Sequence, residues 1–301
     1  FYTGEFNANY DDDVASSVIA FRKFMNLPEF TGISDLTVIK GLLTSNGNTD
    51  RDSNMFDTST QLTDQDVLNM KTYGFSIAGR YLTGTVGTGS EERDKNLTPE
   101  EIQRITDGGL SIFPIYEEGG YELKYFNGYQ GYKDGFLAVA AARELGFPSG
   151  ATIYFAVDVD VLDGDIEGTI APYIIGVINS MADTEYSPGI YGTRNVCLHG
   201  EELGMKYSFV ADMSYGWSGN LGFKMPKNWA FDQFVEYPIG GTPIDQGASS
   251  GKDPGHHTFK TRPIETISPE DAIKSITSDN DFINGKISFD TSTVLMEEPY
   301  I

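Results

Sequence analysis

The chain has 301 residues, and its 44 Asp and Glu against 21 Lys and Arg give a formal net charge of −23. Hydrophobic residues make up 39% of the sequence and aromatic residues 13%, which is enough for a packed core and argues against a disordered chain. Such acidity disfavours nucleic acid and anionic membranes as partners, because both attract proteins through Lys and Arg. No stretch approaches the roughly 20 apolar residues that a membrane-spanning helix needs.

The single cysteine, Cys197, excludes an internal disulfide framework and a zinc site built from several cysteines. The chain opens at Phe1 without a basic and apolar leader, so we interpret it as a fragment or mature form of a longer protein. Its length predicts either one large domain or two smaller ones.

Composition divides the chain into three zones. Residues 1–50 hold two helical patterns, the first after the three aspartates at 11–13 and the second from about Ser34 to Leu43. Residues 51–250 alternate short apolar runs with helical stretches and form the predicted main domain. Residues 251–301 are mixed and mostly polar, and we expect a C-terminal extension or linker there.

Short apolar runs predict the strands of the main domain, with helices between the early ones. The runs are 54–58, 75–82, 110–117, 151–160, 189–192, 207–212, 229–237 and 242–246, and helical patterns cover 63–72, 98–106, 129–145 and 166–181. This order predicts a parallel α/β domain, most simply a compact (β/α)8 barrel of the TIM type, with an open doubly wound sheet as the alternative. Neither a G-x-G-x-x-G motif nor a Walker A sequence occurs, which disfavours a nucleotide-binding site.

The run from Ile153 to Val161 carries the strongest chemical signal. Because side chains alternate along a strand, Tyr154, Asp158 and Asp160 would share one face, and the apolar residues between them the other. This predicts two carboxylates at the mouth of the barrel, where the catalytic groups of barrel enzymes lie. Two acids held close together divide into a proton donor and a charged stabiliser, as cleavage of a glycosidic bond requires.

Two other interpretations of this Asp-x-Asp pair stay open at the level of sequence. The two acids would simply end a strand and cap a turn, or they would hold a divalent metal that carries a nucleotide-sugar diphosphate. The metal hypothesis has less support, because the sequence has no phosphate-binding loop.

Acids and aromatic residues also follow other predicted strands. Asp57, Asp212 and Asp245 each end an apolar run, and acids at several barrel-strand ends predict one shared site. Tyrosine and tryptophan near the same ends offer flat apolar faces to sugar rings. Of the adjacent Glu117 and Glu118 only one can face inward, and Arg80 would either bind substrate or form a simple ion pair. The expected substrate-binding residues are Glu117, Asp212, Arg80, Tyr191, Gln233, Tyr116 and Trp217.

An ordered set of motifs resembles a known family. The motifs are MFDT at 55–58, GRY at 79–81, FPIY at 113–116, YFAVDVD at 154–160, GIYG at 189–192 and WAFDQF at 229–234. In this order they resemble a bacterial family of glycoside hydrolase-like domains. That family is related to the family-25 muramidases, which cleave the glycan strands of peptidoglycan with a compact, irregular (β/α) barrel. The resemblance covers roughly residues 52–250.

The resemblance implies roles for four acids. Asp57 would match the muramidase aspartate of the first strand, Asp158-Val159-Asp160 its Asp-x-Glu, and Asp245 its last-strand aspartate. Asp160 would then be the general acid, with Asp158 and Asp57 as charge stabilisers, and Asp245 would position the N-acetyl group or a water. Aspartate is one methylene shorter than the expected glutamate, and a misplacement of about 1 Å can cost on the order of 100-fold in rate. No metal or organic cofactor is expected.

Residues 1–50 resemble the final two helices of a peptidoglycan-binding module. Together the two resemblances predict an extracellular or cell-wall-associated glycoside hydrolase, muramidase-like, whose partner is peptidoglycan or a related polysaccharide. The alternative is a catalytically inactive glycan-binding protein on the same barrel, in which the shortened acid no longer reaches the glycosidic oxygen.

Overall fold

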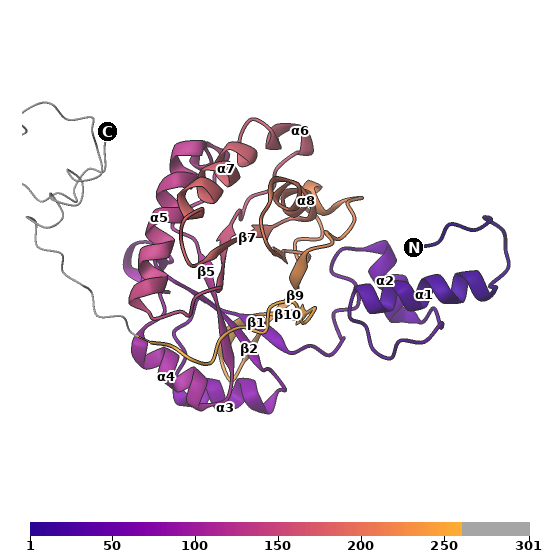
Figure 1. Cartoon of the computed structure of the whole chain (residues 1–301). Helices are drawn as coiled ribbons and strands as arrows, with labels where there is room; N and C mark the ends of the chain where they lie inside the picture. Colours follow the sequence, from indigo (N-terminus) through magenta and orange to yellow (C-terminus); the bar gives the residue numbers. More distant parts are fainter. Residues whose placement is uncertain (261–301) are drawn as a thin grey trace, which may run out of the picture. The chain divides into compact units, whose positions relative to one another are not determined.

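The computed structural model describes residues 1–260, which belong to one compact unit, Phe1–Arg262. Eight strands form a closed barrel in the order β1-β10-β9-β8-β7-β6-β5-β2. Helices lie around the outside of these strands (Figure 1). The predicted α/β barrel of the TIM type is therefore confirmed as an architecture, and the open doubly wound sheet is excluded.

Every predicted apolar run contains or overlaps a barrel strand. The strands are β1 Met55–Asp57, β2 Ile77–Tyr81, β5 Ser111–Tyr116, β6 Thr152–Ala156, β7 Ser187–Gly192, β8 Ser208–Val210, β9 Trp229–Ile239 and β10 Thr242–Ser249. The surrounding helices are α3 Asp64–Thr72, α4 Pro99–Asp107, α5 Gly128–Glu144, α6 Asp163–Ile166, α7 Ile170–Met181 and α8 Arg194–Leu203. A small hairpin after β2 pairs β3 Thr85–Val86 with β4 Arg93–Asp94, and a short 3₁₀ turn, η3 Ser218–Asn220, follows β8.

One strand departs from the predicted parallel order. β10 runs antiparallel to both of its neighbours, β9 and β1. Gly240 and Gly241 join β9 to β10 with φ of 60° and 95°, and a two-residue turn with positive φ at both positions makes a hairpin. The start of β10 consequently lies at the same end of the barrel as the last residues of the parallel strands. Asp245 is thereby paired directly with Asp57 of β1.

Local capping signals explain where two of the helices begin. Thr63 accepts a hydrogen bond from the backbone of Asp66, whose side chain accepts one in return from the backbone of Thr63, which forms a capping box at the start of α3. Thr98 caps α4 by accepting a hydrogen bond from the backbone N–H of Glu101, and Pro99 occupies the first turn, where its missing N–H costs nothing. Both helices therefore begin where their sequence signals predict.

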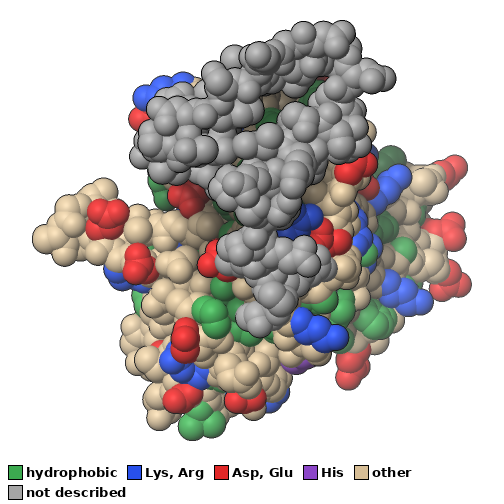
Figure 2. Space-filling view, turned by 60° about the vertical axis from the view of Figure 1, so that its left-hand side comes forward, with side chains coloured by type: hydrophobic (Ala, Val, Ile, Leu, Met, Phe, Trp, Pro, Cys, Tyr) green, Lys and Arg blue, Asp and Glu red, His purple; other side chains and the backbone are tan. Residues whose placement is uncertain are grey.

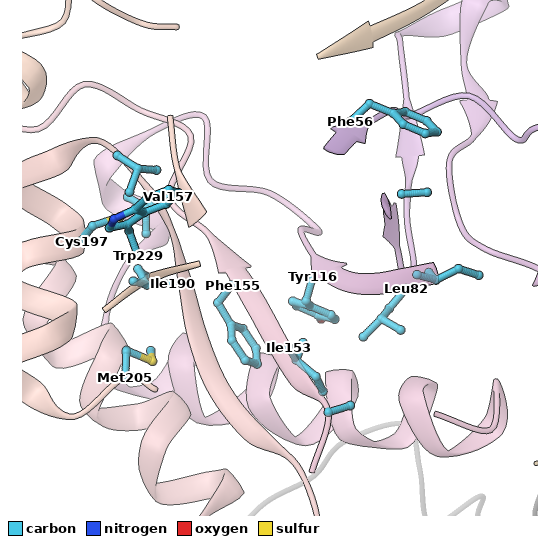
Figure 3. Close-up of a cluster of buried hydrophobic side chains, with 14 of the residues drawn as sticks. Phe56, Leu82, Tyr116, Ile153, Phe155, Val157, Ile190, Cys197, Met205 and Trp229 are labelled. Carbon is cyan, nitrogen blue, oxygen red and sulfur yellow. The ribbon is translucent and has the colours of Figure 1, made fainter. Parts of the chain in front are cut away.

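The strands separate an inner apolar plug from an outer core. The plug fills the barrel with Met55, Ile77, Phe113, Ile115, Tyr154, Phe209, Ala230 and Phe231. Phe113 stacks on Phe231 with ring centroids 4.0 Å apart. On the other face of β6, Ile153 and Phe155 belong to the outer core (Figure 3). The predicted alternation along β6 is confirmed, and because the plug closes the interior, a ligand can bind only above or below it.

The N-terminal segment forms helices α1 Asp12–Phe24 and α2 Leu36–Leu43. Trp229 of β9 donates its indole N–H to the carbonyl of Phe24 at 3.0 Å, and the hydroxyl of Ser45 donates to the carbonyl of Asp212 at 2.8 Å. These contacts join the segment to the barrel. The domain boundary at residue 50 stays a prediction.

Most of the predicted C-terminal extension, residues 261–301, lies outside the described residues. Within residues 1–260, no helix has the length and apolar character needed to cross a membrane. On the part of the face in Figure 2 that is not covered by grey atoms, acidic side chains are spread out with Lys and Arg between them.

Candidate active site

The alternation that builds the plug also builds the site above it. Asp57, Glu117 and Gln233 each come two residues after a plug residue, namely Met55 of β1, Ile115 of β5 and Phe231 of β9. Gly79 makes room for Asp57 and for the plug residue Phe113, because a Cβ at position 79 would lie 2.5 Å from the ring of Phe113 and 2.8 Å from the Cβ of Asp57. Polar groups therefore converge on the barrel end at which the parallel strands finish, which is where barrel enzymes place their catalytic groups.

Gln233 connects two of the predicted catalytic acids. Its amide nitrogen donates to Oδ1 of Asp57 at 2.9 Å and to Oδ2 of Asp245 at 3.4 Å. Its amide oxygen accepts a hydrogen bond from the hydroxyl of Tyr191 at 3.0 Å. Asp57 and Gln233 are almost fully buried, whereas Asp245 and Tyr191 are half-buried. The structure thus brings together four of the residues that the sequence proposed for the site.

A lysine that sequence analysis missed lies among these acids. Lys95 is only 2% exposed, and its Nζ lies 2.6 Å from Oε2 of Glu117 and 4.4 Å from the ring centroid of Tyr81. Glu117 is buried and Glu118 exposed, so Glu117 is the inward-facing member of that pair. In the described part of the chain, no other Lys or Arg forms an ion pair with Asp57, Glu117, Asp158 or Asp245. Lys95 follows a short hairpin, and nothing in the sequence around it marked a site.

Burial and mutual repulsion raise the pKa values of three of these acids. Burial first, and then the charge of Glu117, raise the pKa of Asp158 to about 6 against the opposing charge of Lys95. Burial, Glu236 and Asp158 raise the pKa of Asp245 to about 7. Burial and the charge of Asp245 hold the pKa of Asp57 well above its usual range, although Gln233 opposes this shift. This barrel end therefore holds protons near neutral pH, as acid catalysis requires.

Asp160, the expected proton donor, has a different environment. Its carboxylate accepts hydrogen bonds from the N–H of Ser218 at 2.9 Å, the hydroxyl of Ser218 at 2.7 Å and the N–H of Gly219 at 3.2 Å. Partial burial opposes the shift, but these hydrogen bonds lower the pKa of Asp160, which is the opposite of what a proton donor needs. β6 ends at Ala156, so the alternation that would have aimed Asp160 inward no longer applies.

The two acids of the Asp-x-Asp pair therefore differ in their surroundings: Asp160 is held by the loop after β8, whereas Asp158 interacts electrostatically with Glu117 and Lys95. The turn-capping interpretation expected Asp160 to cap the turn before residues 163–165. In the structure it instead accepts hydrogen bonds from Ser218 and Gly219 at the start of η3, and so ties the loop after β6 to the loop after β8. That second loop carries the half-buried Trp217, which lies next to Ser218. No group of three or more His, Cys, Asp or Glu arranged to hold a metal ion occurs within residues 1–260.

Two more expected substrate-binding residues face away from the barrel interior. Arg80 is fully buried on the outer face of β2, where it pairs with Glu101 of α4 at 2.7 Å, so the ion-pair alternative describes it. Tyr116 packs in the outer core beside Phe155, with ring centroids 5.6 Å apart (Figure 3). Both residues sit one position away from an inward-facing neighbour, so strand alternation turns them toward the helices.

Asp212 is also separate from the mouth. It is fully buried and accepts two hydrogen bonds of 2.7 Å from Arg194 of α8. Its backbone carbonyl holds Ser45, as described above. The carboxylate therefore stabilises the contact between the N-terminal segment and the barrel, and is not available to a sugar.

An apolar groove lies away from the barrel mouth. This groove of about 970 Å³ lies between the two N-terminal helices and the segment after η3, and Phe21, Leu43, Tyr215 and Met225 are among its lining residues. No Asp or Glu of the described chain lines it, so it offers no carboxyl group as a proton donor. The chemistry of the protein is therefore to be sought at the barrel mouth.

Comparison with known proteins agrees with this geometry. The model of the "Rv2525c-like, glycoside hydrolase-like domain" family matches residues 69–283, which is more than half of the chain. The chain belongs to this family. The match to the Rv2525c-like family includes the elements that carry Glu117, Asp158 and Gln233, and it begins after Asp57.

Two curated relatives come from Bacillus subtilis (strain 168). The uncharacterized protein YbfG is 41% identical over 322 residues, covering 99% of this chain and 43% of YbfG. The uncharacterized protein FadG is 38% identical over 272 residues, covering 88% of this chain and 46% of FadG. The chain therefore spans less than half the length of either relative.

Solved structures of the Mycobacterium tuberculosis Tat-secreted protein Rv2525c share the fold. The complex with L-tartrate aligns with a TM-score of 0.55 and 17% identity, covering 68% of this chain and 98% of that one. The complex with HEPES gives a TM-score of 0.53 and 18% identity, covering 65% and 94%. At this level of identity the likeness extends to the barrel only.

Proposed function

We propose that this Rv2525c-like protein is a cell-wall glycoside hydrolase that cleaves the glycan strands of peptidoglycan by carboxylate acid catalysis. The observation that carries the proposal is the convergence of Asp57, Glu117, Asp158 and Asp245 on one barrel end, where burial and neighbouring carboxylates raise the pKa values of Asp57, Asp158 and Asp245. Membership in a glycoside hydrolase-like family supports the reaction class. The resemblance to family-25 muramidases supports the choice of substrate.

In this proposal Asp158, rather than Asp160, is the general acid. Protonated Asp158 transfers its proton to the glycosidic oxygen as the bond between that oxygen and the sugar carbon breaks, and the oxygen keeps the bonding electrons. Asp57 and Asp245 titrate together, and the ionised member of the pair stabilises the positive charge that develops on the sugar ring. The acetamido group of the substrate acts as the nucleophile. Water then opens the resulting intermediate and returns a proton to Asp158.

Half-buried aromatic rings next to these acids suit a sugar ligand. Tyr81 is the last residue of β2 and Tyr191 lies on β7, and the charges of Asp57, Asp158 and Asp245 act on both. Each tyrosine offers a flat face and a hydroxyl. The same rings support the alternative of a non-catalytic glycan-binding protein. We place the protein outside the cell or at the wall. The N-terminal resemblance to a peptidoglycan-binding module supports this location, as does the Tat secretion of the structural neighbour Rv2525c.

Mass spectrometry of purified peptidoglycan, after incubation with the protein, tests the proposal. Wild type should release muropeptides with reducing-end N-acetylmuramic acid. Asp158→Asn should lower this release by at least about 100-fold, because it removes the transferable proton. Asp160→Asn is the matched control two residues away, and it should retain most of the activity. Thermal unfolding of both variants checks that each is folded.

Each other outcome has a defined meaning. Reducing-end N-acetylglucosamine would keep the hydrolase and change the bond that is cleaved. Intact glycan with the protein sedimenting on it would establish the binding protein instead. Activity that survives in Asp158→Asn and disappears in folded Asp160→Asn would return the role of general acid to Asp160.

A further inference from the structure

The hairpin β3–β4 delivers one cation into the barrel mouth. The backbone N–H of Lys95, just after β4, donates to the carbonyl of Gly84 at 3.1 Å. Its side chain then runs inward to Glu117 and over the ring of Tyr81. Gly84 has φ of 92°, and a Cβ there would lie 3.0 Å from Cε of Lys95. The path of the lysine side chain is therefore tightly enclosed.

A buried ion pair behind the sheet holds this lysine in place. Arg80 donates from Nη2 to the carbonyl of Lys95 at 3.1 Å and from Nη1 to the carbonyl of Thr58, the residue after Asp57. Glu101 accepts the remaining guanidinium hydrogen bonds, at 2.7 Å from Nε and 3.1 Å from Nη2. One fully buried guanidinium thus sets the backbone position of the lysine and of the first-strand acid together.

The charges around Lys95 come from every strand end that packs against it. Glu117 follows β5, Asp158 follows β6 and Tyr81 ends β2, and these are the groups that Lys95 contacts or whose charge it influences. The exposed Glu118 lies on the Gly84 side. The charge of Asp158 also acts on Asp57 and Asp245, where it contributes to the raised pKa values of both acids. A single ammonium among so many carboxylates stabilises most strongly the carboxylate that it contacts.

We propose that Lys95 is the positioning residue that decides which acid of the mouth carries the transferable proton. Its ammonium pairs with Glu117 at 2.6 Å, whereas Asp158 forms no ion pair within the described residues and is the acid that donates the proton. Arg80 and Glu101 hold the lysine from behind the sheet. This inference rests on the proposed hydrolase, because it assigns the donor of that reaction.

Two substitutions should move the pH profile of peptidoglycan cleavage in opposite directions. Lys95→Met removes a positive charge, so every remaining acid binds its proton more tightly and the alkaline limb should rise by about 1–3 pH units. Glu117→Gln leaves the lysine facing Asp158 without the competing carboxylate, so the alkaline limb should fall. A purely structural role for Lys95 predicts lower activity at every pH with an unmoved profile.

Carboxyl-carbon NMR titration gives a second readout that does not depend on turnover. In Lys95→Met the titration of Asp158 should shift upward, and in Glu117→Gln it should shift downward. Arg93→Gln is the matched control, because Arg93 belongs to the same hairpin but is exposed and donates to Ser59 outside the mouth. It should leave both the profile and the titrations unchanged.

The outcomes separate this inference from the function on which it rests. If wild type cleaves no glycan but the NMR titrations shift as expected, the hydrolase fails and the role of Lys95 stands. Unmoved titrations in folded Lys95→Met, or shifts of the same sign in both mouth variants, would overturn the inference even with active enzyme. If Lys95→Met does not fold, the direction of the Glu117→Gln shift still decides.

Discussion

The barrel holds two buried acidic clusters that differ in how their charge is balanced. The mouth cluster, Asp57, Glu117, Asp158 and Asp245, has one lysine, Lys95, as its ion-pair partner within the described chain. The anchor network sits where the N-terminal segment meets the barrel, and it pairs two acids with two arginines. Its members are Asp212 with Arg194 and Asp232 with Arg51, each pair at 2.7 Å.

The comparison shows that a raised pKa does not by itself mark a catalytic acid. Burial, with a further contribution from Asp212, raises the pKa of Asp232 to about 8 although the charge of Arg51 opposes it. Yet Asp232 is fully buried, so no ligand can reach it. Asp158 and Asp245 combine raised pKa values with partial exposure and a shortage of cations. That combination distinguishes a cluster that can exchange protons with a substrate from one that holds two segments together.

The largest expected effect on stability lies in the anchor network. Arg194→Met leaves Asp212 buried without the two hydrogen bonds that Arg194 donates, so the free energy of unfolding should fall by about 3–5 kcal/mol. The double variant Arg194→Met/Asp212→Asn removes the stranded charge and should recover a large part of that loss. Urea denaturation at pH 7 measures both. If the double variant is no more stable than Arg194→Met, the unpaired charge of Asp212 is not the cause of the lost stability.

The mouth cluster should show the opposite sign of effect. The pKa of Asp158 is about 6 in the folded protein against 3.8 normally, so the folded state binds more protons between these values and loses stability as pH rises through them. Asp158→Asn removes that penalty. It should therefore be more stable than wild type at pH 8, by at most about 3 kcal/mol, and no more stable near pH 4. Thermal unfolding across this range provides the measurement, and equal differences at both pH values would contradict the assignment.

Asp160 should give the smallest effect, again of opposite sign to that of Asp158. Its pKa is lowered, so its hydrogen bonds to Ser218 and Gly219 stabilise the fold above the usual pKa and lose that effect as pH falls through the lowered value. Because the carboxylate is largely exposed, Asp160→Asn should cost only about 1 kcal/mol at pH 7. The cost should shrink toward pH 3 in urea titrations. A gain in stability at pH 7 would show that Asp160 belongs to the mouth cluster after all.

Much of the fold was predictable because it depends on short-range patterns. Apolar runs mark all eight barrel strands, and Thr63 and Thr98 mark the starts of two helices. Alternation along β6 correctly separates Tyr154 in the plug from Phe155 in the outer core. The same alternation, with the ordered motifs, brought Asp57, Asp158 and Asp245 forward as candidates. Alternating strands and helices predict parallel strands, and only the Gly240-Gly241 pair before β10 indicates the hairpin that makes this strand antiparallel.

The remaining features arise from contacts between segments that are distant in the sequence, and local sequence patterns do not predict such contacts. Periodicity predicts which residues of a strand share a face, but only while the strand lasts, and the partner of Asp160 lies 58 residues further along the chain. Arg80 of β2 and Glu101 of α4 are 21 residues apart in the sequence and form their ion pair only in the folded protein. Lys95 could be recognised as part of the mouth cluster only in the structure, where the β3–β4 hairpin places it next to Glu117. The amino-acid sequence alone determined the barrel and most of its acids, because strand and helix periodicity are local; closure of the barrel decided which acids meet and which cation reaches them.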